Sequence, residues 1–194
     1  MESLKARILA EGRNMGRGIL KVDSFVNHQV DAELMHEAGQ ELAQRFAGDG
    51  VTKVLTAEIS GIAPALMTAL ALRVPIVYAR KTKPITMPEQ IFVRTAPSHT
   101  KGLEVSLMVS PEFLGPGDYV LIVDDFLATG KTIDALVQIV RDAGAQLVGI
   151  GAVIEKTFEG GRAVLEHYGI PVHALVTITS MENGKITFSN GVGS

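Results

Sequence analysis

The string VLIVDDFLATGKT, residues 120–132, holds the side chains best suited to chemistry in this chain. Its four apolar residues predict a buried strand, and two carboxylates, Asp124 and Asp125, follow at the carboxyl end of that strand. The small-residue run Ala128–Thr132 then turns into a helix, where backbone N–H groups and the helix dipole can hold an anion. Carboxylates accept hydrogen bonds from hydroxyl groups. The string therefore predicts a sugar-phosphate site, with the acids on the sugar and the loop around the phosphate.

Two other interpretations of this string need to be considered. Gly130-Lys131-Thr132 resembles the end of a P-loop, but a P-loop requires a glycine five positions before Gly130, where this chain has Asp125. We therefore exclude a nucleoside-triphosphate P-loop. The second alternative is that the acid pair only caps the helix that follows it. In the same way, Lys131 could be a solvated lysine at a helix start, because backbone groups alone can hold a phosphate.

A second anion site is indicated by the segment Glu58–Gly61, which lies between a predicted strand over Lys53–Ala57 and a predicted helix. Free N–H groups at that helix start would face the same strand ends, and Gly61 would let a ligand approach closely. On the residues alone, an ordinary helix cap by Ser60 explains the segment equally well. Arg80 and Lys81, just past the next strand, are either partners of this anion or a solvated pair of charges.

The elements that must position these residues alternate between helix and strand. Asp31 can cap a helix whose apolar stripe runs from Leu34 to Phe46. The remaining pattern predicts a helix over Leu4–Leu9, strands over Lys53–Ala57, Pro75–Arg80, Tyr119–Asp124, Val148–Glu155 and Val172–Ser180, and helices over Gly61–Leu72, Lys131–Ala143 and Gly161–Tyr168. Such alternation is typical of an α/β fold with a mostly parallel sheet, in which ligands bind at the carboxyl ends of the strands.

The segment Thr82–Glu104 interrupts this pattern with three prolines. A long loop in a compact domain is commonly functional, so we expect a flexible lid over about residues 82–104, with its tip at Ser98–Lys101. The alternative is a plain β-hairpin that includes a strand over Ile91–Arg94.

Composition limits the class of protein. The chain has 194 residues, 46% of them hydrophobic and 20% charged, which predicts one folded domain over residues 1–194. There is no apolar run long enough for a membrane helix, and the net charge of −3 argues against nucleic acid as a partner. The absence of cysteine excludes disulfides and thiolate metal sites. We expect a cytoplasmic protein.

The string at 120–132 resembles the phosphoribosyl diphosphate signature of the type I phosphoribosyltransferases. The resemblance extends over LKVDSFVNHQVD at 20–31, SGIAPA at 60–65 and VIEKTFEGGR at 153–162. It implies a twisted, mostly parallel sheet flanked by helices, with a small hood formed by residues of about 1–30 and 156–194. It also implies a homodimer.

The resemblance implies a role for each candidate residue. The 5′-phosphate of the donor would rest on a loop whose members are Ala128, Thr129, Gly130, Lys131 and Thr132. Asp124 and Asp125 would be the catalytic acids that hold the ribose hydroxyls. The diphosphate would contact Ser60, Gly61, Arg80 and Lys81. Mg²⁺ would be bound through that diphosphate, without a metal site made by the protein itself.

Three further residues match the base contacts of the family. Lys156 can only donate hydrogen bonds, which suits the 6-oxo group of a purine, and Asn27 can donate to a 2-oxo group. Leu20 would supply apolar cover. Ala128 stands where hypoxanthine–guanine enzymes have an acid, and xanthine, the most acidic of these bases, needs a general base least. The residues therefore predict xanthine as the preferred acceptor, guanine as the second, and adenine as inert.

Several alternatives remain open from the sequence. Without the family, Lys156 is a solvated lysine at a strand end, Leu20 a core leucine and Asn27 a turn asparagine. The ATG run and Gly160–Arg162 also resemble adenine-specific members, and a hypoxanthine/guanine enzyme is a further possibility. A regulator that senses the sugar diphosphate and binds nucleic acid would need an added domain or a basic face, which we do not expect here.

Overall fold

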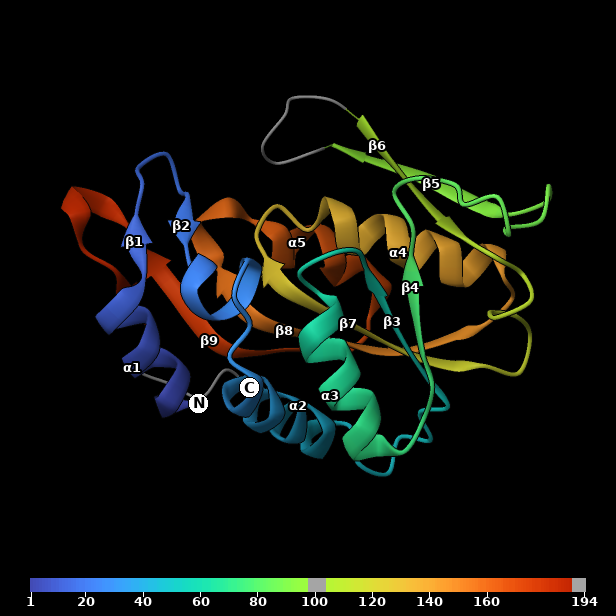
Figure 1. Ribbon diagram of the computed structural model, residues 1–194, viewed down its shortest axis with the longest axis horizontal. Coiled ribbons are helices and arrows are strands. Elements are labelled where there is room, and N and C mark those ends of the chain that lie inside the picture. The colour runs from blue at the N-terminus through green and yellow to red at the C-terminus, as the bar shows by residue number, and fades with distance from the viewer. Residues whose placement is uncertain (98–103, 190–194) are drawn as a thin grey trace.

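The computed structural model describes residues 1–97 and 104–189 and is built around one six-stranded sheet (Figure 1). The strand order is β10–β9–β8–β7–β3–β4, and every neighbouring pair is parallel except β10 with β9. The strands are β3 (Lys53–Ala57), β4 (Ile76–Ala79), β7 (Tyr119–Leu127), β8 (Gln146–Lys156), β9 (Val172–Ser180) and β10 (Thr187–Phe188). The predicted α/β class with a mostly parallel sheet is confirmed.

Helices cover both faces of the sheet, and each face has its own apolar core. One face carries α1 (Glu2–Glu11), α2 (Ala32–Arg45) and α3 (Ile62–Leu72). The other carries α4 (Lys131–Asp142) and the short α5 (Gly161–Leu165), which continues as a 3₁₀ turn, η3 (Glu166–Tyr168). Because the sheet is covered on both sides, its central strands read as apolar runs in the sequence.

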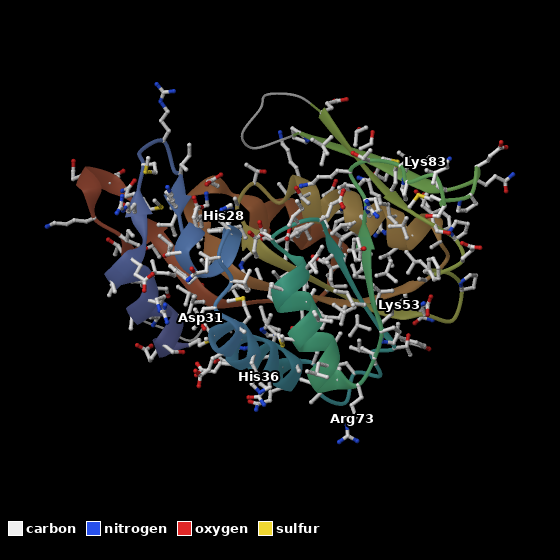
Figure 2. All side chains as sticks on the ribbon, viewed as in Figure 1. His28, Asp31, His36, Lys53, Arg73 and Lys83 are labelled. Carbon is white, nitrogen blue, oxygen red and sulfur yellow. The ribbon has the colours of Figure 1, made fainter. Side chains whose placement is uncertain are left out.

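The start of α2 follows the chemistry predicted for it. The Asp31 side chain accepts a hydrogen bond from the Leu34 backbone N–H at 3.1 Å, which satisfies one of the free donors at the helix start. The predicted stripe from Leu34 to Phe46 is buried, whereas His36 is exposed and points away from the sheet (Figure 2). An amphipathic pattern thus fixes which side of α2 meets the sheet.

Two small segments from opposite ends of the chain meet beside the sheet. The first contains β1 (Arg13–Asn14), β2 (Leu20–Lys21) and a π-helical turn, η1 (Asp23–Asn27). The second is made of two separate 3₁₀ turns from the carboxy-terminal part of the chain, η2 (Thr157–Glu159) and η4 (Glu182–Gly184). The Asn14 side-chain amide donates to the Met181 carbonyl at 2.6 Å, so the two segments are directly joined.

The segment after β4 contains a hairpin. Strands β5 (Phe92–Pro97) and β6 (Glu104–Val109) pair antiparallel, and Arg94 forms an ion pair with Asp142 of α4 at 2.6 Å. The β-hairpin that the sequence left open as an alternative is therefore present, although only Ile91–Arg94 was predicted as a strand and the bounds of β5 and β6 were not. The predicted tip, Ser98–Lys101, lies outside the described residues.

Strand β7 is longer than predicted. It was expected to end at Asp124, but it continues to Leu127, so both acids lie inside the strand. The reason is the longer neighbour β8, whose ladder with β7 extends to Leu127 opposite Glu155. No helix among the described residues is long and apolar enough to cross a membrane.

Candidate active site

A pocket of about 510 Å³ opens at the carboxyl ends of β3, β7 and β8, where ligands bind in parallel α/β sheets. All the predicted site residues line it except Thr129, Lys131 and Arg80. The lining residues that had been predicted are Leu20, Asn27, Ser60, Gly61, Lys81, Asp124, Asp125, Ala128, Gly130, Thr132 and Lys156. These residues come from segments far apart in the sequence, and the fold gathers them into one cavity.

The acid pair lies at the centre of this pocket. Asp124 is buried and Asp125 half-buried, and the Asp125 backbone N–H donates to Asp124 Oδ1 at 3.0 Å. Burial raises the pKa of Asp124 well above its ordinary value, and the neighbouring Asp125 charge raises that pKa further. Burial also raises the pKa of Asp125. The Asn27 amide donates to Asp125 Oδ2 at 3.5 Å, which ties the amino-terminal segment to the acids.

The predicted phosphate loop connects β7 to α4 and is held by close backbone packing. Gly130 has a positive φ of 75°, and a Cβ there would lie 2.7 Å from the Gly161 carbonyl oxygen. A Cβ on Gly161 would lie 2.2 Å from the Ala128 carbonyl oxygen. Both positions therefore require glycine. The Gly160–Arg162 run packs against the loop at these contacts. Lys131 begins α4 with an exposed side chain, and Thr129 lies in the loop without lining the pocket.

The second predicted anion loop approaches the acids directly. A Cβ on Gly61 would lie 2.6 Å from Asp124 Oδ1 and 2.3 Å from Thr56 Oγ1, so only glycine lets the loop run this close to β7. Glu58 and Ile59 also line the pocket, and the peptide bond between them is cis. At this point the loop presents backbone groups and a carboxylate to the same cavity.

Arg80 was expected to face the pocket, but the structure places its side chain elsewhere. Its guanidinium forms an ion pair with Glu58 Oε2 at 2.9 Å, and it lies 5.8 Å from the Tyr78 ring centroid. The other carboxylate oxygen of Glu58 accepts a hydrogen bond from the Lys81 backbone N–H. Arg80 is therefore connected to the pocket through Glu58, whereas Lys81 lines the pocket itself.

Lys156 lies at the end of the pocket formed by the two joined terminal segments. Its Nζ donates to the Gly18 carbonyl oxygen at 2.9 Å, lies 5.6 Å from the Phe126 ring centroid and forms an ion pair with Glu159. Lys156 is buried, although the sequence alone also allowed a solvated lysine. Leu20 is buried beside it in the core.

Sequence reasoning missed several residues of this pocket. They are Arg17, Gly18, Ile19, Ala57, Phe126, Ile133 and Glu159, whereas Glu58 and Ile59 belong to the predicted second anion segment. Phe126 lies in the string at 120–132, and Glu159 lies three residues after Lys156. The sequence close to each of them could therefore have indicated a place in the pocket. Arg17–Ile19 form the turn between β1 and β2, which has no pattern of its own and reaches the pocket only through tertiary packing.

In residues 1–97 and 104–189, no cluster of three or more histidines, aspartates or glutamates is placed to hold a metal ion. Among the carboxylates that line the pocket, Glu58 and Glu159 form ion pairs with Arg80 and Lys156, so the acid pair is the set best placed to face a cation. A hard cation such as Mg²⁺ takes six oxygen ligands, so most of them would have to come from a bound substrate or from water.

A mostly parallel sheet with an acid pair and a glycine-containing phosphate loop at its carboxyl edge defines the phosphoribosyltransferase class. The chain belongs to this family, since the family model described as "Phosphoribosyl transferase domain" matches residues 23–168. Over 190 residues it is 50% identical to xanthine phosphoribosyltransferase of Moorella thermoacetica, covering 98% of this chain and 97% of that one. It is 48% identical to xanthine phosphoribosyltransferase of Bacillus licheniformis over 194 residues and the full length of both chains.

Solved structures agree with this class. The crystal structure of adenine phosphoribosyltransferase from Rhodothermus marinus superposes with a TM-score of 0.73 at 27% identity, covering 92% of this chain and all of that one.

Proposed function

We propose that this protein transfers the 5-phosphoribosyl group from phosphoribosyl diphosphate to xanthine, which yields xanthosine 5′-monophosphate and diphosphate. The observation that carries the proposal is the placement of Lys156, a hydrogen-bond donor, at one end of the pocket whose centre is the acid pair. The xanthine phosphoribosyltransferases named above, about half identical over nearly the whole chain, support it.

In this proposal the two anion loops hold the donor. The 5′-phosphate lies in the loop Ala128–Thr132 at the start of α4, where backbone N–H groups are free. The diphosphate lies against Ser60, Gly61 and Lys81, and Arg80 acts on it through Glu58. The ribose hydroxyls donate to the acid pair between the two loops.

The chemistry follows from these positions. The bond between the ribose carbon and the diphosphate oxygen breaks as the base nitrogen attacks, so positive charge develops on the ribose. Asp124 and Asp125 lie where carboxylates stabilise that charge and hold the ring in place. Mg²⁺ held by the donor would supply positive charge beside the leaving diphosphate.

The base is selected at the Lys156 end of the pocket. Lys156 donates to the 6-oxo group, Asn27 to the 2-oxo group, and Leu20 covers the ring. Adenine carries a 6-amino group, which is itself a donor, so it finds no acceptor on Lys156. The adenine enzymes among the solved structures share the fold, and Lys156 is the feature that favours an oxopurine here.

The experiment is direct. The protein is incubated with phosphoribosyl diphosphate, Mg²⁺ and each of xanthine, guanine, hypoxanthine and adenine, and the nucleotide formed is measured. We expect xanthine to give the highest kcat/KM, guanine the second, and adenine essentially no product. Use of adenine at a rate comparable with xanthine would refute the proposal.

We also propose that the segment of about residues 82–104 acts as a lid that keeps water from the reacting ribose. Its support is the position of Lys81, which lines the pocket immediately before the segment begins. Limited proteolysis tests the idea: phosphoribosyl diphosphate with Mg²⁺ should slow cleavage within the segment, and equal cleavage with and without it would contradict a lid.

A homodimer is the third part of the proposal. Exposed apolar side chains gather on α3 and next to it, at Ile59, Leu66, Leu70 and Tyr78. A second copy of the chain is the partner that would cover them. We also propose a cytoplasmic location, because a donor as highly charged as phosphoribosyl diphosphate stays in the compartment where it is made.

A further inference from the structure

The ammonium of Lys156 does not act alone at the base end of the pocket. Glu159, the last residue of the η2 turn, forms an ion pair with it, and both side chains line the pocket. The two side chains are 10% and 19% exposed, so the pair is largely shielded from water and from salt. The Glu159 carboxylate therefore offsets the charge of Lys156, and a base bound in the pocket would contact both groups.

The surroundings hold this pair in place. The Gly18 carbonyl accepts from Lys156 Nζ at 2.9 Å, and the Phe126 ring lies 5.6 Å from the same nitrogen. Gly18 has a φ of +73°, and a Cβ there would lie only 3.4 Å from Glu159 Oε1, so the β1–β2 turn covers the carboxylate closely. The pair is thus clamped between the turn, β7 and η2.

A lysine–glutamate pair with no net charge is complementary to a base edge that places an acceptor beside a donor. Lysine offers a donor and glutamate, beside it, offers an acceptor. An oxopurine has the matching edge, because its 6-oxo group accepts and the adjacent N1–H donates. Adenine has the reverse edge, with a 6-amino donor beside an N1 acceptor.

We infer that Glu159 is a specificity-determining residue whose carboxylate accepts from N1–H of the base while Lys156 donates to the 6-oxo group. This inference rests on the proposed function. It adds that the pair, having no net charge, selects the neutral form of the base over the ionised form.

The other charged groups of the pocket are consistent with this assignment. They are Arg17, Glu58, Lys81, Asp124 and Asp125. Asp124 and Asp125 are the acid pair, Glu58 belongs to the second anion loop, and Lys81 follows β4 and contacts Glu58 through its backbone N–H. Arg17 on the β1–β2 turn is exposed to water, which weakens its field. Glu159 is therefore the carboxylate that contacts Lys156 and offsets its charge.

Two variants separate hydrogen bonding from charge. Glu159→Ala removes the acceptor and the charge, and we expect it to raise the KM for xanthine about tenfold while the KM for phosphoribosyl diphosphate stays within about twofold. Glu159→Gln keeps an acceptor oxygen but leaves the Lys156 ammonium uncompensated. In Glu159→Gln, we expect kcat/KM for xanthine to be maintained at the alkaline pH where wild-type kcat/KM falls, because the variant accepts the ionised base.

The controls distinguish this inference from the proposed function. Glu182→Gln removes an exposed carboxylate elsewhere in the carboxy-terminal segment and should match the wild type, and thermal unfolding should show that both Glu159 variants are folded. Unchanged xanthine kinetics and pH profiles in Glu159→Ala and Glu159→Gln would overturn the role of Glu159 and leave the proposed function intact. A rise in KM for xanthine that hypoxanthine does not share would overturn the assignment to the N1–H edge. Absence of transfer to every purine by the wild type would overturn both.

Discussion

At the scale of single residues, the acid pair on β7 is the most unusual feature of the molecule. Carboxylates are seldom buried unless they are paired with cations, yet Asp124 is only 7% exposed, and the charge of Asp125 raises its pKa more than the charge of Lys81 lowers it. Such an arrangement weakens the folded protein when no substrate is present. Perturbed acids of this kind are characteristic of functional sites, where a ligand supplies the missing partners.

The first prediction concerns the activity of this pair. Asp125→Ala removes an acceptor for the ribose hydroxyls, and we expect kcat to fall by about a hundredfold or more because stabilisation of the ribose charge is lost. Steady-state kinetics with xanthine measures the effect, with thermal unfolding as the check that the fold persists. Near-normal turnover in a folded variant would remove Asp125 from the proposed mechanism.

The second prediction concerns stability against pH. Burial raises the folded-state pKa of Asp124 above the ordinary value of 3.8, so the folded form binds its proton more tightly than the unfolded form does. The stability that this acid contributes is complete below that ordinary value and is lost as the pH rises through the raised folded-state pKa. Asp124→Asn keeps an uncharged side chain at every pH. It should therefore unfold at a higher temperature than the wild type at neutral pH, with the difference vanishing in acid.

Thermal unfolding of the ligand-free proteins over a range of pH tests this second prediction. Asp49→Asn, which alters an exposed aspartate, is the matched control and should show no such pH-dependent gain. Equal melting temperatures of Asp124→Asn and the wild type at neutral pH would mean that burial does not penalise the charge of Asp124.

At the scale of elements, the packing of two glycine turns positions the phosphate loop. The loop between β7 and α4 meets the start of α5 backbone against backbone, at Gly130 and Gly161. A helix start can hold a phosphate only if its N–H groups point into the cavity. Here α5 packs against the loop at Gly161, which does not itself line the pocket, so this short helix helps to set the loop.

The third prediction follows from that contact. In Gly161→Ala the new methyl group would lie 2.2 Å from the Ala128 carbonyl oxygen, so the loop must shift. We expect the KM for phosphoribosyl diphosphate to rise about tenfold and the free energy of unfolding to fall by about 1–3 kcal/mol. Gly115→Ala is the matched control, since a Cβ at Gly115 meets nothing within 4 Å. An unchanged KM for the donor would show that α5 does not set the loop.

At the scale of the whole molecule, one helix leaves apolar surface uncovered. The α3 helix packs on α2 and the sheet through residues such as Ala65 and Ala69, but Leu66 and Leu70 face outward. These two leucines are four positions apart, so they lie on one side of the helix. Exposed large apolar side chains on one helix face are typical of a protein–protein interface.

The fourth prediction tests the proposed homodimer. Leu70→Glu places a charge on this face, and we expect the molar mass measured by light scattering to fall from twice the chain mass to the chain mass. Leu9→Glu changes an equally exposed leucine on α1 and should leave the mass at that of a dimer. A monomeric wild type, or a Leu70→Glu variant that remains dimeric, would argue against this interface.

Much of the fold was predictable because its signals are local. The alternation of strands and helices, the Asp31 cap and the loop after β7 each depend on residues within one or two turns of one another. Strands β5 and β6 were partly missed because their pairing joins residues on either side of a loop, and such pairing leaves little mark on either strand alone. The roles of the site residues remain predictions.

The sequence by itself determined that two acids and a glycine-containing loop follow one another at the end of a strand, because spacing along that strand and turn dictates this. The assignment of Lys156 to the base came from the family resemblance and is still a prediction. Only the tertiary structure decided which partners these groups have. Lys156 meets Gly18 across 138 positions of the chain, Gly161 supports Gly130, and Arg80 turns to Glu58 instead of the pocket. Such contacts depend on how separate elements pack, and packing is a property of the whole chain that no local pattern encodes.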